Sequence, residues 1–184
     1  MINTAIGAQI SDEHLTINEK SWGISSEDIG SLVSIVREKD REIKEVLKDG
    51  ETLLHIAARD DAEETCLALI RSGYNINAID NFGQTPLFLA IQKGNIEIIE
   101  MLLDSGADVN CFDMYLNTPL ICAITAELDI KYDLNIKIID ILIKSGANLM
   151  WVNAAQETIC KVAEKSGRTK ILNHLIEKLG DVNE

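Results

Sequence analysis

The chain of 184 residues is poor in aromatic residues and in proline: aromatics make up 4% of it, and only two prolines occur. This scarcity argues against a sandwich of short strands joined by proline-containing turns. Basic residues are also few, 17 against 30 acidic ones, which gives a formal net charge of −13. A protein of that charge repels phosphate backbones, so we expect no nucleic-acid partner.

Long hydrophobic runs and clustered metal ligands are missing as well. The longest uncharged stretch, 114–126, is too short to cross a bilayer, and residues 1–11 lack the basic and apolar regions of a secretory signal. The four cysteines stand apart from one another, and no histidine lies at a zinc-ligand spacing from them. We therefore expect a cytoplasmic protein with reduced cysteines, no membrane contact, no metal and no cofactor.

What the sequence does contain is an internal repeat. Three segments align column by column, with their threonines 33 residues apart: Thr52–Ala57, Thr85–Ala90 and Thr118–Ala123. Ser-Gly pairs at 72–73, 105–106 and 145–146 mark the second half of each unit. A fourth, weaker copy begins at Thr158, 40 residues after Thr118, so about seven residues are inserted in the third unit.

This pattern resembles the ankyrin repeat family, whose unit of 33 residues is a β-turn followed by two antiparallel helices with a T-P-L-H-x-A signature. The resemblance covers about residues 47–179. It implies an all-α fold class: an ankyrin-repeat solenoid of about three full repeats with degenerate capping units at both ends. Threonine would cap each inner helix, and glycine would end each outer helix.

The repeat divides the chain into an extension and one domain. Residues 1–24 show no clear period, and we expect this extension to be partly disordered. The ankyrin domain, 25–184, would comprise a capping unit at 25–46 with a helix over 27–39, repeats at 47–79, 80–112 and 113–152, and a capping unit at 153–184. The insertion, within residues 126–133, would protrude between an inner helix ending near Thr125 and an outer helix starting near Asn135, where it would either lengthen the loop or add helical turns.

Residues with reactive side chains fit structural roles better than catalytic ones. His55 occupies the histidine column of the signature, where a hydrogen bond to neighbouring backbone is expected. The acidic run at residues 60, 61, 63 and 64 suits a solvated helix start. No phosphate-binding glycine loop, nucleophile elbow or zinc-binding helix motif occurs. We expect no enzyme.

The resemblance implies that a protein partner binds the variable turn tips and the exposed ends of the inner helices. In this sequence those positions are Lys48, Asp49, Glu51, Arg59, Asp60, Asn81, Phe82, Gln84, Gln92, Lys93, Met114, Tyr115, Asn117, Thr125 and Ala126. The apolar tip residues Phe82, Met114 and Tyr115 would either anchor an interface or pack on adjacent turns.

Two further residues near these tips depart from the family pattern. Leu116 stands where the family has glycine, so we expect a reshaped tip there. Trp151 would cover the interface between the last two units or take part in binding.

These features predict a non-catalytic protein–protein interaction module that is monomeric when unbound. Residues 1–133 carry a net charge of −14 and residues 134–184 of +1, so the partner is expected to have a basic surface. An acidic inhibitor or masking protein fits best, for example a bacterial immunity-type protein that neutralises a toxin. The alternatives are an effector or NF-κB-inhibitor-like regulator that binds a host or cellular protein, and a structural scaffold.

Overall fold

The computed structural model describes residues 49–128 and 133–181. The expected extension, the capping helix over 27–39 and Lys48 lie outside these residues. The described part of the chain forms eight α-helices: α2 (Leu53–Arg59), α3 (Glu63–Arg71), α4 (Pro86–Lys93), α5 (Ile96–Asp104), α6 (Pro119–Thr125), α7 (Asp133–Lys144), α8 (Ile159–Lys165) and α9 (Thr169–Asp181). Its one β-bridge joins Val152 and Thr158, so the predicted all-α fold is confirmed.

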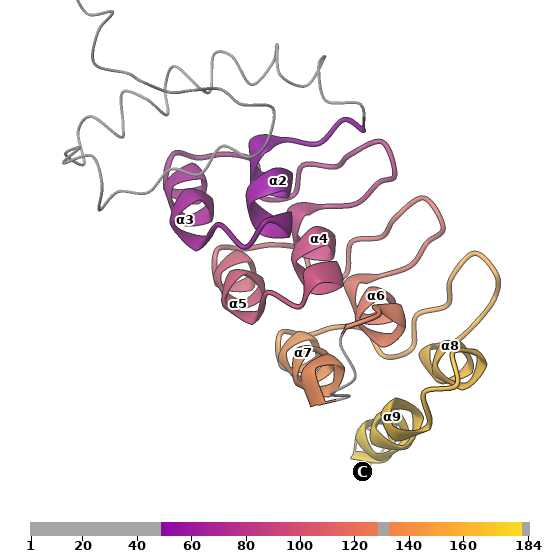
Figure 1. Cartoon of the computed structure of the whole chain (residues 1–184). Coiled ribbons are helices and arrows are strands. Elements are labelled where there is room, and N and C mark those ends of the chain that lie inside the picture. The colour runs from indigo at the N-terminus through magenta and orange to yellow at the C-terminus, as the bar shows by residue number, and fades with distance from the viewer. Residues whose placement is uncertain (1–48, 129–132, 182–184) are drawn as a thin grey trace, which may run out of the picture.

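The helices pack as four pairs in two layers (Figure 1). Helices α2, α4, α6 and α8 form the inner layer, and each packs on the next one along the chain. Helices α3, α5, α7 and α9 form the outer layer and pack against their inner partners. Because each unit contacts mainly its neighbours, the molecule is the stacked solenoid that the repeat predicts.

Threonine begins the inner helices, as predicted, but it does not cap all of them in the same way. Thr118 Oγ1 accepts from Ile121 N at 3.5 Å, and Thr158 Oγ1 accepts from Lys161 N at 3.4 Å. These bonds satisfy N–H groups that the first helical turn leaves unpaired. Thr85 Oγ1 instead lies 3.6 Å from the sulfur of Cys111 in the next repeat.

His55 makes the structural hydrogen bonds expected of its column. The ring is fully buried, its Nδ1 accepts from Thr52 N at 3.0 Å, and its Nε2 lies 3.0 Å from the carbonyl oxygen of Gln84. A carbonyl only accepts and an amide N–H only donates, so the proton sits on Nε2. His55 thereby ties α2 to the segment that precedes α4.

Stacking supplies a core that no single repeat could build. The side chains of Leu87, Phe88 and Ile91 on α4 are fully buried in the core of the stack. Ile98 and Ile99 on α5 are buried at the junction of the two layers. Burial of one such side chain contributes about 1.5–3 kcal/mol, so the aliphatic residues of the repeat hold the stack together.

The insertion lies where the spacing predicts it, between α6 and α7. Helix α7 begins at Asp133, two residues before the expected start, so part of the insertion lengthens this helix. Leu128 and Leu134 lie against Gly94 at the turn of the preceding repeat, where an added Cβ would stand 3.2 Å and 2.9 Å from their methyl groups. The described start of the insertion therefore packs on the second repeat.

Candidate protein-binding surface

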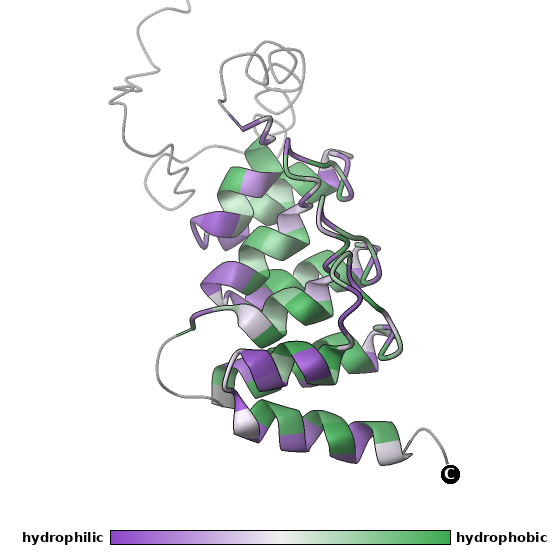
Figure 2. Cartoon of the chain, turned by 90° about the vertical axis from the view of Figure 1, so that its right-hand side faces the viewer, coloured by the Kyte–Doolittle hydropathy of each residue, from purple (hydrophilic) through white to green (hydrophobic). Residues whose placement is uncertain are grey.

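Three loops join the outer helix of one repeat to the inner helix of the next, and we call them fingers. Finger 1 spans residues 72–85, finger 2 spans 105–118 and finger 3 spans 145–158. Figures 1 and 2 show that they project side by side from one edge of the stack. The turn-tip positions within the described residues lie on these fingers and, for Asp49 and Glu51, on the segment before α2.

The same hydrogen-bond network holds the tip of each finger. One buried side chain, Asp80, Asp113 or Asn153, accepts through its Oδ1 from the backbone N–H groups two and four residues further on. These six distances lie between 2.8 and 3.0 Å. Such side-chain turns fix the backbone, so the tip side chains are presented from a rigid support.

The expectation that Leu116 reshapes the tip of finger 2 was wrong. Leu116 has φ +57°, close to the +76° of Gly83 at the same position of finger 1. Its N–H donates to Asp113 O at 2.9 Å, as Gly83 N–H donates to Asp80 O at 3.1 Å. The Asp113 network holds leucine in the left-handed conformation although that costs roughly 1–2 kcal/mol.

Backbone hydrogen bonds connect each finger to the next one. Met114 N donates to Phe82 O at 2.8 Å, and Ala154 N donates to Tyr115 O at 3.0 Å. The same bond links finger 1 to the segment before α2, from Asn81 N to Asp49 O at 2.8 Å. The fingers therefore form one continuous edge.

Exposed apolar side chains gather on this edge. Nine large hydrophobic side chains are exposed among the described residues, and all but Ile176 on α9 lie on the fingers. We call these eight the apolar edge: Ile79, Phe82, Phe112, Met114, Tyr115, Leu116, Met150 and Val152. Phe82, Met114 and Tyr115 are 47%, 58% and 61% exposed, so they project into solvent instead of packing on adjacent turns. Exposed apolar side chains gathered along one edge are typical of an interaction site.

One set of equivalent residues on the apolar edge was not predicted from the sequence. Ile79, Phe112 and Val152 occupy equivalent positions, 33 and 40 residues apart, just before the tips. A large apolar residue in the same loop position of three repeats was the signal that could have identified them.

Trp151 joins fingers 2 and 3 and is half-buried. Its ring stacks on Phe112, with centroids 5.7 Å apart and planes at 19°, and its Nε1 donates to Leu116 O at 2.8 Å. Of the two roles expected for it, this geometry matches the covering of the last interface. It also gives Phe112 an aromatic support.

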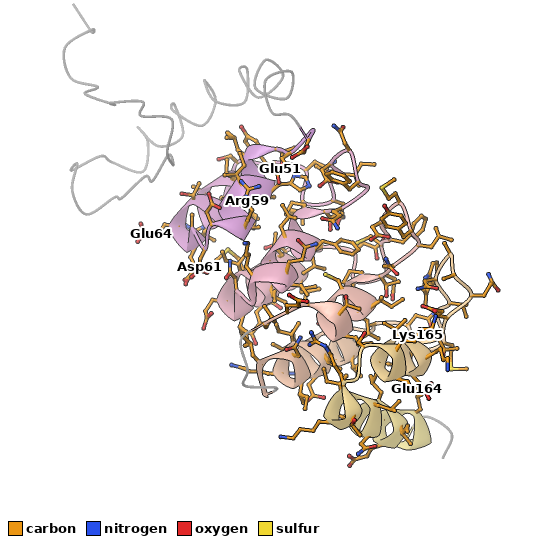
Figure 3. The ribbon with its side chains drawn as sticks, turned by 45° about the vertical axis from the view of Figure 1, so that its right-hand side comes forward. Glu51, Arg59, Asp61, Glu64, Glu164 and Lys165 are labelled. Carbon is orange, nitrogen blue, oxygen red and sulfur yellow. The ribbon has the colours of Figure 1, made fainter. Side chains whose placement is uncertain are left out.

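A side-chain pair spans each inner helix, from the loop that precedes the helix to its last turn, except in the third repeat. Glu51 accepts from Arg59 at 2.6 and 2.7 Å (Figure 3), and Gln92 donates to Gln84 at 3.2 Å. Lys165 pairs with Glu157 in the last repeat. We call these pairs polar bridges.

The third repeat has Asn117 and Thr125 at the bridge positions, and they do not meet. Asn117 Nδ2 donates to Asp113 at 3.2 Å, whereas Thr125 Oγ1 donates to Ile121 O at 3.1 Å. The neighbouring Ala126 is buried, so its side chain does not reach the surface. No side-chain pair therefore crosses α6, whose residues are all buried except the exposed Thr125 at its end.

The acidic side chains stand mostly away from the fingers. Within the described residues, 49–128 hold 13 acidic and three basic residues, and 133–181 hold six and seven. Glu63 and Glu64 begin α3, and exposed Glu97, Glu100 and Asp104 belong to α5 in the outer layer. The surface thus combines an apolar edge with an acidic outer face on its first repeats.

The cysteines sit in environments that suppress their reactivity. Burial raises the pKa of the Cys66 and Cys122 thiols to about 12, so both stay protonated at neutral pH. Burial also raises the pKa of Cys111 and Cys160. All four thiols are free. Within the ranges that the structure covers, no three metal-ligating side chains come together, and no helix is long and apolar enough to span a membrane.

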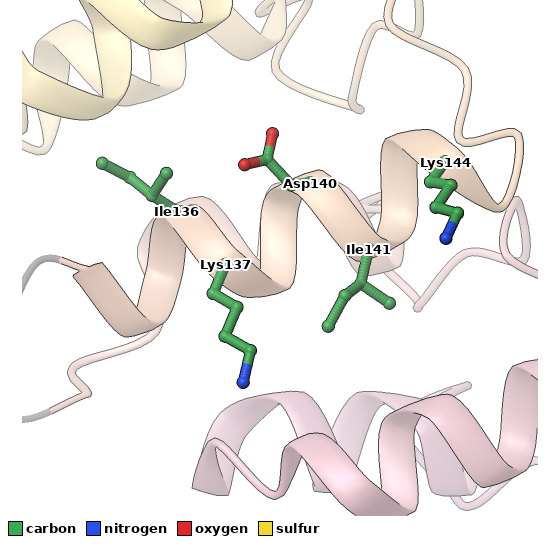
Figure 4. Close-up of a pocket in the computed structure, with 5 residues that line it drawn as sticks. All are labelled: Ile136, Lys137, Asp140, Ile141 and Lys144. Atoms are coloured by element: carbon green, nitrogen blue, oxygen red, sulfur yellow. The ribbon is translucent and has the colours of Figure 1, made fainter.

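An open hollow of about 360 Å³ lies beside α7, away from the fingers. Figure 4 shows its lining on that helix: Ile136, Lys137, Asp140, Ile141 and Lys144. The Asp140 carboxylate is engaged by His174 Nε2 of α9 at 2.7 Å. Because one helix supplies the lining and its charged groups do not converge, the hollow lacks the features of a small-molecule site.

A stack of helix pairs with a rigid edge of fingers defines a helical repeat protein whose recognition surface lies outside the stacking faces. The chain belongs to the ankyrin repeat family: the family model, "Ankyrin repeats (3 copies)", matches residues 24–113 and 54–150. No curated protein matches the chain. Ankyrin repeats indicate a protein–protein interaction module, and its partner is a protein.

Proposed function

We propose that this protein is an acidic, non-catalytic inhibitor or masking protein that binds a basic protein partner in the cytoplasm. The observation that carries the proposal is the apolar edge, which holds eight of the nine exposed large hydrophobic side chains of the described residues on hydrogen-bonded fingers. A bacterial immunity-type protein that covers the active surface of a toxin is a concrete case.

Binding would use the fingers together with the exposed ends of the inner helices. The tip residues Phe82, Met114 and Tyr115 are the apolar anchors, and Ile79 and Phe112 extend them along the edge. Exposed Gln92 and Lys93, at the end of α4, would supply polar contacts beyond these anchors. An apolar centre with a polar rim is the usual arrangement of an interface hot spot.

The acidic outer face would act at longer range than the contacts. With 13 acidic and three basic residues over 49–128, the first repeats attract a basic protein before it touches the fingers. Charges outside the contact area accelerate association, and buried apolar contacts slow dissociation. The two features of the surface therefore predict separate kinetic effects.

Surface plasmon resonance with the isolated partner tests this division. Raising NaCl from 50 to 300 mM should slow association, because salt screens exposed charges over about 10 Å at 0.1 M. Phe82→Ala and Tyr115→Ala should each speed dissociation. For an interface hot spot, the loss of binding free energy is roughly 1–4 kcal/mol.

The matched control is Ile176→Ala, which removes an exposed apolar side chain from α9, away from the fingers. It should leave both rates unchanged. An association rate that does not change with salt would refute the proposal that the partner is basic. Unchanged dissociation rates for both aromatic variants would refute the apolar edge as the binding surface.

A further inference from the structure

We propose that the apolar edge binds an extended, proline-rich segment of the partner in the polyproline II conformation, with every third side chain of the segment seated against one finger. This inference rests on the proposed function, because it names the chemistry of the partner for the same surface.

The spacing of the fingers follows from their hydrogen bonds. Within a finger two chain segments face each other, as the bonds from Asp80 N to Gln84 O and from Asp113 N to Asn117 O, both 3.0 Å, show. A further backbone hydrogen bond, from Met114 N of finger 2 to Phe82 O of finger 1 at 2.8 Å, joins one finger to the next. Hydrogen-bonded segments lie about 4.8 Å apart, so one finger follows another after about 9.6 Å. Packed helices, which lie about 8–10 Å apart, agree with this interval.

Only one regular backbone presents equivalent side chains at that interval. A polyproline II helix repeats every three residues, after about 9.3 Å. An α-helix returns to the same face after seven residues, about 10.5 Å. Over the two intervals between three fingers, its side chains would be displaced by about 2 Å from the finger positions. A β-strand places side chains on one face about 6.7 Å or 13.4 Å apart, which matches neither finger.

The side chains of the edge suit such a segment. Phe82 and Tyr115 are exposed aromatic residues on adjacent fingers, and Phe112 stacks on Trp151. Rows of aromatic side chains are the surfaces on which proline-rich segments dock. A polyproline II segment also has no internal hydrogen bonds, so its carbonyl groups need donors. The exposed amide of Asn81 and hydroxyl of Tyr115 stand along the edge to supply them.

Finger 2 is where the segment is held most strongly. It carries four of the eight side chains of the apolar edge: Phe112, Met114, Tyr115 and Leu116. Fingers 1 and 3 carry two each. We therefore place the main anchor at finger 2.

Three synthetic peptides of equal length and equal net charge, each with the same terminal lysines and a fluorescein label, provide the test. The first is proline-rich with leucine at every third position, the second has the same composition with the leucines moved out of that period, and the third is a proline-free amphipathic helix. Fluorescence anisotropy with the full chain should give the first peptide a dissociation constant at least about tenfold below those of the others.

Matched variants locate the peptide on the edge. Tyr115→Ala and Ile79→Ala should each weaken the first peptide about tenfold or more, while Ile176→Ala should not. Circular dichroism of each variant shows whether it keeps the helical fold.

The other outcomes overturn the inference in distinguishable ways. Tighter binding of the helical peptide would show that the edge binds an amphipathic helix. Equal dissociation constants for the two proline-rich peptides would contradict the proposed three-residue spacing of contacts. If no peptide binds but Tyr115→Ala still releases the natural partner faster, the inference fails and the proposed function stands. If the finger variants leave the natural partner unaffected, the proposed binding surface fails with it.

Discussion

Leu116 holds a left-handed backbone conformation that glycine adopts at the same position of finger 1. Because the Cβ of leucine disfavours this conformation, Leu116→Gly should raise the free energy of unfolding by about 1 kcal/mol. Urea denaturation followed by circular dichroism measures the change. We also expect the variant to bind its partner less tightly, since the exposed leucine belongs to the apolar edge.

Ala154→Gly is the control for this substitution. It places glycine two residues before the equivalent tip position Gln156, at a residue whose φ is not positive. There glycine only increases the freedom of the unfolded chain, so the variant should be slightly less stable than the parent. A loss of stability in Leu116→Gly as large as in Ala154→Gly would show that the tip is not strained.

The insertion between α6 and α7 can be removed at one well-defined place. Deleting residues 127–133 and changing Leu134 to glycine would restore the family spacing, because Leu134 would then occupy the position that Gly94 holds with φ +79° in the second repeat. The product should fold with one cooperative transition. Its free energy of unfolding should fall by about 2 kcal/mol, because the partly buried side chains of Leu128 and Leu134 are both removed.

Thermal unfolding monitored by circular dichroism decides this prediction. The same deletion with Leu134 retained is the companion variant, and it should be less stable because leucine would be forced to positive φ. A deletion variant that is unfolded at 25 °C would show that the inserted segment is an essential part of the core.

The elements that the sequence predicts well are those on which local and repeated signals agree. Thr118 and Thr158 cap inner helices, glycines end the outer helices, and the 33-residue period gives the stacking order. These features depend on neighbours along the chain or on the same position one repeat away. Each can therefore be found by aligning the sequence with itself.

Other features of the surface depend on contacts that no alignment contains. The tip at Leu116 keeps its shape because the Asp113 side chain organises it, and Trp151 closes the last interface through Phe112 and a carbonyl of finger 2. The packing of Leu134, in the first turn of α7, against Gly94 of another repeat is a further contact of this kind. Residue type alone did not separate the acidic outer face from the apolar fingers.

For the whole molecule, the uneven charge predicts that salt stabilises the fold. Residues 49–128 contain 13 acidic residues against three basic ones, so the excess negative charges repel one another in the folded state, and salt screens this repulsion. Raising NaCl from 10 to 300 mM should increase the melting temperature by a few degrees, which differential scanning calorimetry measures.

The double variant Glu97→Gln, Glu100→Gln tests the cause of that effect. Both residues are exposed on α5, so their neutralisation should raise the melting temperature at 10 mM NaCl and change it less at 300 mM. A melting temperature that falls with salt would mean that ion pairs such as Glu51–Arg59 outweigh the repulsion.

The bonds from finger to finger, together with packing between neighbours only, also make the protein a series of mechanical links. A load applied between its ends passes through each repeat in turn, so the chain lengthens in steps instead of giving way at once. A unit of 33 residues releases about 115 Å of extended chain, and the third unit with its 40 residues releases about 140 Å. The insertion therefore marks its own repeat as the longest step when the molecule is stretched.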